Sequence, residues 1–191
     1  MEILQKKLIL ASKSPRRKQL LAEAGFTFEI QTKDVEESYP ADLPVKEVAP
    51  FLAEKKALAS IDLIKDDEIL LTADSVVILG DEIFEKPKDF ADAQRILRSL
   101  SGKVHQVITG VCLVSKKEKR VFAGVSDVHF EPLSEEEIDF YITNYKPFDK
   151  AGAYAIQEWI GHCKISKIEG TYTNIMGLPM ELVFRNLAEM D

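Results

Sequence analysis

The residue best placed for chemistry in this sequence is Asp74, a carboxylate inside the apolar run 69–79. A charged group there costs several kcal/mol unless it is paired, exposed at an edge or bound to a metal. Asp74 is therefore a functional candidate, with a satisfied structural aspartate as the alternative. Glu36 and Glu37 lie in the acidic stretch 34–44, where they would be solvated or would join Asp74 in holding a hard cation.

A second candidate is the segment SKSPRRK, from Ser12 to Lys18, which follows a short apolar run. Ser14 is suited to cap a helix that starts at Pro15. The free N–H groups of a helix start, two hydroxyls and the guanidinium of Arg16 would suit an anion such as a phosphate. The alternative is an ordinary capped helix whose basic residues face water.

Two lysine positions are weaker candidates. Lys56 follows Lys55 on an expected helix, where such pairs normally face water. Lys86 lies in EKPKD, a loop that Pro87 stiffens, and it would either be solvated or be held toward a site.

The segment DKAGAYAIQ combines small residues, which allow close approach of the backbone, with Gln157 at its end. The amide of Gln157 has a donor and an acceptor and would read the edge of a nucleobase, although a plain edge strand is an equal alternative. His105 invites a general-base role, but a lone histidine in an apolar strand is more often a hydrogen-bonded core residue. The three histidines are too scattered for a metal triad.

Strand and helix patterns alternate along the chain and predict an α/β fold with a mixed sheet covered by helices. Strands are expected over 8–11, 26–33, 69–79, 104–115, 120–131, 150–157 and 164–168, and helices over 15–24, 45–60, 89–100, 134–144 and 178–187. The tight turn between 104–115 and 120–131 requires an antiparallel pair, which disfavours an all-parallel sheet. Neither GxGxxG nor GxxxxGK[ST] is present, so the sequence predicts neither a dinucleotide-binding site nor a P-loop nucleotide site.

Chain length indicates the number of domains, and net charge limits the classes of binding partner. The 191 residues predict one domain, 1–191, or one domain with two lobes. A net charge of −7 argues against nucleic-acid binding but leaves room for a small-anion site. The two cysteines form no ligand motif and suggest no disulfide framework. No signal-peptide pattern or membrane span is found, so a cytoplasmic location without a membrane partner is expected.

Six segments occur together in an order that resembles the Maf family, whose members are historically called septum-formation inhibitors. They are LILASKSPRRKQLL, TADSVV, EKPKD, LSGKVHQVITGV, DKAGAYAIQ and MGLPM. The resemblance implies a nucleoside triphosphate pyrophosphatase that cuts between the α and β phosphorus. It also implies an elongated mixed sheet flanked by helices, with two lobes around a central cleft, similar to inosine triphosphatase. A homodimer and a divalent cation, Mg²⁺ or Mn²⁺, are further expectations from the resemblance.

The resemblance also assigns roles to residues. By the resemblance, Asp74 would be the acidic active-site residue, and the other catalytic residues would be Glu37, Lys56 and Lys86. Glu37 and Asp74 would also hold the metal. The substrate-binding positions are Ser12, Arg16, Ser75 and Gln157.

Ser75 and Gln157 look like the branch acting on dTTP and UTP, although that branch usually has threonine at position 75. A sister branch acting on 7-methyl-GTP tends to have glutamine and glutamate at these two positions. The alternatives kept open are therefore 7-methyl-GTP hydrolysis and a non-enzymatic regulator of cell division.

Overall fold

The computed structural model describes residues 1–190 and divides the chain into two compact units. Unit 1 comprises Met1–Asp74, Thr109–Gly124 and Gly177–Asp191, and unit 2 comprises Ser75–Ile108 and Val125–Met176. The strands are β1 (Lys7–Leu10), β2 (Phe28–Ile30), β3 (Glu68–Leu79), β4 (Glu82–Phe84), β5 (Val104–Val114), β6 (Lys119–Phe130) and β7 (Ile165–Glu169). The α-helices are α1 (Pro15–Glu23), α2 (Val48–Ala59), α3 (Phe90–Leu100), α4 (Glu135–Tyr145), α5 (Trp159–Cys163), α6 (Tyr172–Met176) and α7 (Met180–Glu189).

The strands form one mixed sheet in the order β2-β1-β3-β5-β6-β7, with β4 paired to β3. Strand β1 runs parallel to both β2 and β3. The pairs β3–β4 and β6–β7 are antiparallel. The expected α/β class with a mixed sheet flanked by helices is confirmed.

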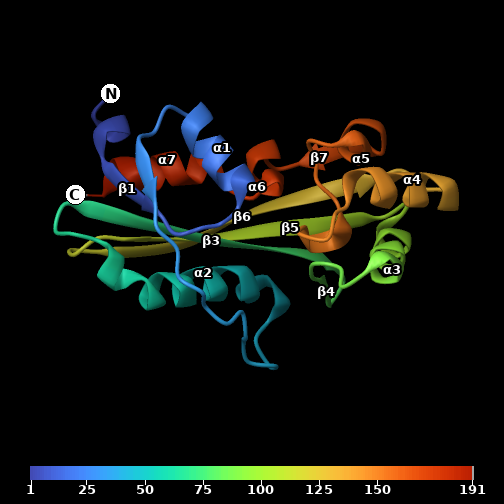
Figure 1. Ribbon diagram of the computed structural model, residues 1–191, viewed down its shortest axis with the longest axis horizontal. Helices are drawn as coiled ribbons and strands as arrows, with labels where there is room; N and C mark the ends of the chain where they lie inside the picture. The colour runs from blue at the N-terminus through green and yellow to red at the C-terminus, as the bar shows by residue number, and fades with distance from the viewer. Residues whose placement is uncertain (191) are drawn as a thin grey trace. The chain divides into compact units, whose positions relative to one another are not determined.

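In unit 1, helices α1 and α7 lie on one side of the strands and α2 lies on the other (Figure 1). The α2 side is apolar because Ala53 and Ala57 of α2 pack against Ile9, Leu70 and Cys112 of three strands. A hydroxyl also ties helix to strand, since Thr72 Oγ1 of β3 donates to the Ala53 carbonyl of α2 at 2.7 Å. These contacts fix which face of α2 meets β3.

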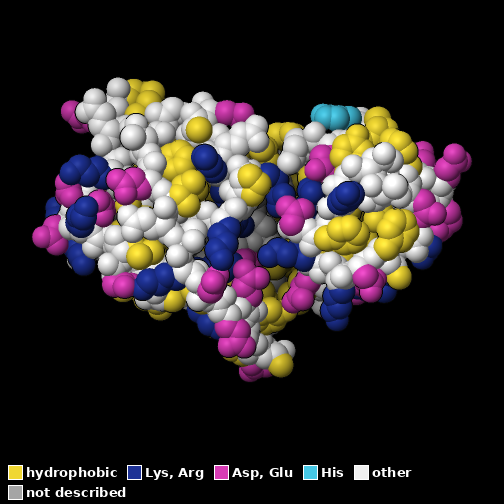
Figure 2. Space-filling view, viewed as in Figure 1, with side chains coloured by type: hydrophobic (Ala, Val, Ile, Leu, Met, Phe, Trp, Pro, Cys, Tyr) yellow, Lys and Arg dark blue, Asp and Glu magenta, His cyan; other side chains and the backbone are white. Residues whose placement is uncertain are grey.

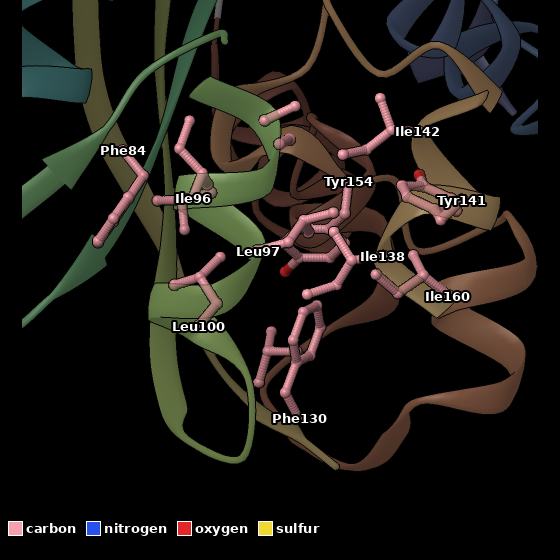
Figure 3. Packing of buried hydrophobic residues seen from close by; sticks show 14 of the residues in the cluster. Phe84, Ile96, Leu97, Leu100, Phe130, Ile138, Tyr141, Ile142, Tyr154 and Ile160 are labelled. Atoms are coloured by element: carbon pink, nitrogen blue, oxygen red, sulfur yellow. The ribbon is translucent and has the colours of Figure 1, made fainter. Parts of the chain in front are cut away.

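In unit 2, a cluster of buried hydrophobic side chains joins α3 and α4 to the strands and to the chain around Tyr154. Figure 3 shows Leu97 of α3, Ile138 of α4 and Tyr154 packed against one another, with Phe130 of β6 beside them. Helix α4 starts with a complete capping box, in which Ser134 and Glu137 bond reciprocally to backbone N–H groups. This helix matches its expected start closely.

The prediction of a strand over 150–157 is wrong. Residues Ala151–Ala153 form a 3-10 turn, and both Gly152 (φ +70°) and Ala153 (φ +58°) are left-handed, which a β-strand cannot accommodate. The short helices α5 and α6 are missing from the expected elements, because five residues are too few to establish a helical period.

The N-cap interpretation of Ser14 is wrong in its chemistry. Ser14 is the N-cap of α1 by position, but its side chain makes no capping bond. The Ser12 hydroxyl instead accepts from the Ser14 N–H at 3.2 Å. The polar side chain that organises this helix start is therefore two residues earlier.

Within residues 1–190, no helix is long and apolar enough to cross a membrane. Cys112 is buried and Cys163 is exposed, and both are free thiols. Burial raises the pKa of the Cys112 thiol to about 12, so it stays protonated and unreactive.

Candidate functional site

The centre of the candidate site in unit 1 is the ammonium group of Lys56, which bridges two carboxylates. Lys56 Nζ lies 2.5 Å from Asp74 Oδ1 and 2.6 Å from Glu37 Oε1. Lys56 follows Ala53 by one helical turn, so the bond from Thr72 to the Ala53 carbonyl brings Lys56 over Asp74. The structure thus brings together three of the predicted catalytic residues.

Burial makes this cluster different from an ordinary surface ion pair. The side chains of Asp74 and Lys56 are 13 % and 17 % exposed, whereas Glu37 is 49 % exposed. One ammonium lies between two carboxylates, so the three groups together carry one net negative charge. Partly desolvated charges interact more strongly than solvated ones, and this arrangement favours a further cation.

The loop that carries Glu37 is tied down by two other lysines. Lys13 Nζ lies 2.5 Å from Asp34 Oδ1, and Lys55 Nζ donates to Ser38 O and Ser38 Oγ, each at 2.8 Å. These bonds flank Glu37 on both sides and hold its carboxylate near Lys56. Lys55 therefore positions the loop, while its neighbour Lys56 contacts the carboxylates directly.

Arg17 is a site residue that the sequence reasoning missed. Its guanidinium donates to the carbonyls of Ala73 and Gly177, each at 2.8 Å, and to Ser12 Oγ at 3.3 Å. Burial lowers the pKa of Arg17, while the charge of Asp74 acts in the opposite direction. Arg17 therefore joins Ser12 to the residue directly before Asp74.

The sequence signal that could have indicated Arg17 is its position at the start of the expected helix. It is the third residue of α1, from which a side chain reaches back toward the residues before the helix. Arg16, the arginine assigned to substrate binding, is the second residue of α1 and is half-buried.

The remaining predicted residues, Ser75, Lys86 and Gln157, lie in unit 2. The Gly152 N–H donates to the carbonyl of Glu85 at 3.3 Å, which places the loop of Lys86 beside the segment that leads to Gln157. Gly152 also packs against the side chain of Val77, and Ser75 shares a face of β3 with Val77 because side chains alternate along a strand. Ser75, Lys86 and Gln157 thus come from three neighbouring elements.

Gln157 has an unsatisfied polar atom. Its Oε1 is buried and has no hydrogen-bond partner among residues 1–190. A buried amide oxygen without a partner is costly, so such an atom in a native protein calls for a ligand or water that completes it. Lys86, by contrast, is exposed.

His105 is a core residue rather than a general base. It is 1 % exposed, and its Nε2 lies 2.8 Å from the hydroxyl of Tyr154. Burial lowers the pKa of His105 to about 3, so the imidazole is neutral at physiological pH. The core interpretation of this histidine is confirmed.

Known proteins match this chain over nearly its full length. The sequence model of the Maf family, described as Maf-like protein, matches residues 7–190. A Bacteroides fragilis protein named dTTP/UTP pyrophosphatase is 46 % identical over 185 residues, which are 96 % of each chain. A Porphyromonas gingivalis protein of the same name is 47 % identical over 96 % of this chain and 94 % of its own. Among solved structures, the Staphylococcus aureus Ham1 protein aligns with a TM-score of 0.46 and 16 % identity over 65 % of this chain and 72 % of its own. On the family match and the identities of 46 % and 47 % to the two relatives, the chain belongs to the Maf family.

Proposed function

We propose that this protein hydrolyses dTTP and UTP to the nucleoside monophosphate and pyrophosphate. The observation that carries the proposal is the partly buried cluster in which Lys56 bridges Glu37 and Asp74. Two relatives that share nearly half of its residues are named dTTP/UTP pyrophosphatase, which supports the same substrates here. Gln157 agrees with that branch in residue type, and Ser75 keeps a hydroxyl where that branch usually has threonine.

The donor set fits a divalent cation such as Mg²⁺ or Mn²⁺. Hard cations prefer carboxylate oxygens, and Glu37 and Asp74 already share one cation, the Lys56 ammonium. Residues 1–190 contain no group of three or more His, Cys, Asp or Glu side chains suited to hold a metal. Two carboxylates suit Mg²⁺, which usually takes its other ligands from substrate phosphates and water. When bound, the ion would neutralise phosphate charge and polarise the α-phosphoryl group.

The cationic residues of the chain would offset the charge of the substrate. A nucleoside triphosphate carries about four negative charges near neutral pH, and Arg16, Lys56 and Lys86 would bind its phosphate oxygens. The N-terminal end of α1 adds backbone N–H groups and a partial positive charge. Arg17 would act indirectly, by holding Ser12 and the strand that presents Asp74.

Hydrolysis requires water to attack the α phosphorus in line with the departing pyrophosphate. The new bond joins the water oxygen to the α phosphorus, and the bond from that phosphorus to the bridging oxygen breaks. Asp74 would accept the proton of this water or hold the metal on that side, and both roles need its charged form. Positioning and charge neutralisation would supply most of the acceleration.

A panel of nucleotides tests the proposal. Wild-type protein with Mg²⁺ is assayed for pyrophosphate release from dTTP, UTP, CTP, GTP, ATP and 7-methyl-GTP, in water enriched in ¹⁸O. We expect dTTP and UTP to be the preferred substrates, with the label in the monophosphate. Preference for 7-methyl-GTP would contradict the proposed substrates, and binding without turnover would favour the regulatory alternative.

Gln157 provides the first variant. Uracil and thymine present the O4 acceptor and the N3–H donor, which an amide can pair with, whereas cytosine reverses this pattern. Replacement by glutamate removes the donor and adds charge. We therefore expect Gln157→Glu to lower kcat/KM for dTTP and UTP by about 10-fold or more, as measured by pyrophosphate release. Unchanged pyrimidine kinetics would place base recognition elsewhere.

A further inference from the structure

The hydroxyl of Tyr141 in α4 binds the chain on both sides of Gln157. It accepts a hydrogen bond from the Ala155 N–H at 3.0 Å and donates one to Glu158 Oε2. Tyr141 is fully buried and Ala155 is 6 % exposed, so these bonds are shielded from water. One oxygen atom therefore fixes the residues two before and one after Gln157.

Glu158 extends this network to the start of the same segment. Its Oε1 lies 3.4 Å from Nζ of Lys150, a buried lysine that also pairs with Asp149 at 2.9 Å. The carboxylate is only 19 % exposed and is thus held between a tyrosine and a lysine. The two ends of the segment 149–158 are joined through side chains.

These side-chain bonds matter because the segment is not part of the sheet. No strand ladder runs through residues 150–157, where the structure has a 3-10 turn followed by irregular chain. The imidazole of His162 adds a contact of 3.1 Å to the carbonyl of Gln157. The backbone that carries Gln157 is therefore held by these side-chain bonds together with one backbone bond, from the Glu158 N–H to the Ala155 carbonyl at 3.1 Å.

The Tyr141 hydroxyl stays in one protonation state under working conditions. Burial raises its pKa, and the bond to Glu158 raises that pKa further. The group thus remains a neutral O–H that both donates and accepts.

We propose that Tyr141 and Glu158 are positioning residues that set the base selectivity of the enzyme by fixing the amide of Gln157. This inference rests on the proposed function, since it concerns how the same site reads a pyrimidine. Neither residue belongs to the set that the family resemblance assigns to the site.

The test removes one hydroxyl and compares it with a matched control. Tyr141→Phe keeps the buried ring but loses both hydrogen bonds. Tyr145→Phe removes a hydroxyl from the neighbouring ring, which stacks on Tyr141 at 5.0 Å but takes no part in the network. We expect Tyr141→Phe to raise KM for UTP about 10-fold with kcat within about twofold, and to lower the UTP-to-CTP ratio of kcat/KM by a similar factor. Tyr145→Phe should match the wild type.

A second pair of variants keeps the test decisive if Tyr141→Phe fails to fold. Glu158→Gln retains an oxygen that can accept from Tyr141, whereas Glu158→Ala does not. We expect the glutamine variant to keep most of the selectivity and the alanine variant to lose it, with both folded by circular dichroism.

The positioning role is overturned if Glu158→Gln and Glu158→Ala have the same UTP-to-CTP ratio of kcat/KM, or if Tyr141→Phe and Tyr145→Phe do. Neither result would contradict the proposed function, which the wild-type nucleotide panel tests. A wild-type preference for other nucleotides would instead overturn the proposed function. The same variants, measured on the preferred nucleotide, would then still decide the positioning role.

Discussion

At the scale of single residues, Lys56 is the counter-ion of Glu37 and Asp74. Its ammonium neutralises part of the charge on Glu37 and Asp74, at the position a divalent cation would need. A metal held by these two carboxylates would compete with the ammonium, which would then be free to bind a phosphate. Metal affinity without nucleotide should therefore be limited by Lys56.

Removal of this charge gives a direct prediction. Lys56→Met removes the ammonium that both carboxylates share, so the affinity for Mn²⁺ in the absence of nucleotide should rise about 10-fold, which corresponds to about 1.4 kcal/mol. Isothermal titration or the electron paramagnetic resonance signal of free Mn²⁺ measures it. Lys55→Met is the control, because it removes the same charge one residue away, where the ammonium contacts Ser38. Equal or weaker Mn²⁺ binding in Lys56→Met than in Lys55→Met would refute the competition.

The buried neutral imidazole of His105 predicts how stability depends on pH. Burial lowers the pKa of His105 from 6.5 to about 3, so the unfolded chain binds a proton in this range that the folded chain does not. The contribution of His105 to stability is complete above about pH 6.5 and is lost as the pH falls toward 3, by at most about 1.4 kcal/mol per pH unit.

Urea unfolding between pH 4 and 6.5 tests this dependence. The slope of the unfolding free energy against pH should be shallower in His105→Phe than in the wild type. Replacement of the exposed His162 by glutamine should leave the slope unchanged. Parallel slopes for all three proteins would contradict a neutral, buried His105.

At the scale of elements, regular segments were predictable and irregular ones were not. Long apolar strands such as β3 and the capped helix α4 carry strong local signals, and both were predicted close to their observed bounds. Residues 150–157 have an apolar pattern that favours a strand, but Gly152 packs against Val77 and the chain turns there. That contact joins residues far apart in sequence, so local patterns could not reveal it.

Local sequence patterns also could not reveal every residue of the candidate site. The apolar run around Asp74 pointed to that residue, and the resemblance assigned Glu37 and Lys56 to act with it; in the structure these three side chains meet. Arg17 was overlooked because its partners Ala73 and Gly177 lie 56 and 160 positions away. The catalytic and binding roles of all these residues stay predictions.

The turn at Gly152 can be tested by adding one methyl group. A Cβ on Gly152 would lie 2.8 Å from Val77 Cγ2, and its φ of +70° is unfavourable for alanine. We expect Gly152→Ala to lower the free energy of unfolding by about 2–4 kcal/mol, the sum of strain and overpacking. Gly80→Ala is the control, because Gly80 has a φ of +62° with nothing within 4 Å of its added Cβ, so it loses only the conformational part. Equal losses in the two variants, measured by urea unfolding, would show that Gly152 has room for a side chain.

At the scale of the whole molecule, the net charge argues against nucleic-acid binding and leaves room for a local site for a small anion. Acidic and basic side chains both occur on the drawn face of each unit in Figure 2. The net charge of −7 disfavours binding to the phosphate backbone of a nucleic acid. The homodimer expected from the family resemblance stays a prediction, which light scattering after gel filtration would test.

The central claim is that the Asp74 carboxylate acts in pyrophosphate release, and the most direct test is the turnover of Asp74→Asn. Rates of pyrophosphate release from UTP and dTTP are compared with those of the wild type and of Asp67→Asn, which makes the same change in an exposed aspartate paired with Lys7. With the fold verified by circular dichroism, we expect kcat to fall about 100-fold or more in Asp74→Asn and to stay near the wild-type value in Asp67→Asn. A folded Asp74→Asn protein that turns over within about twofold of the wild type would remove Asp74 from the mechanism.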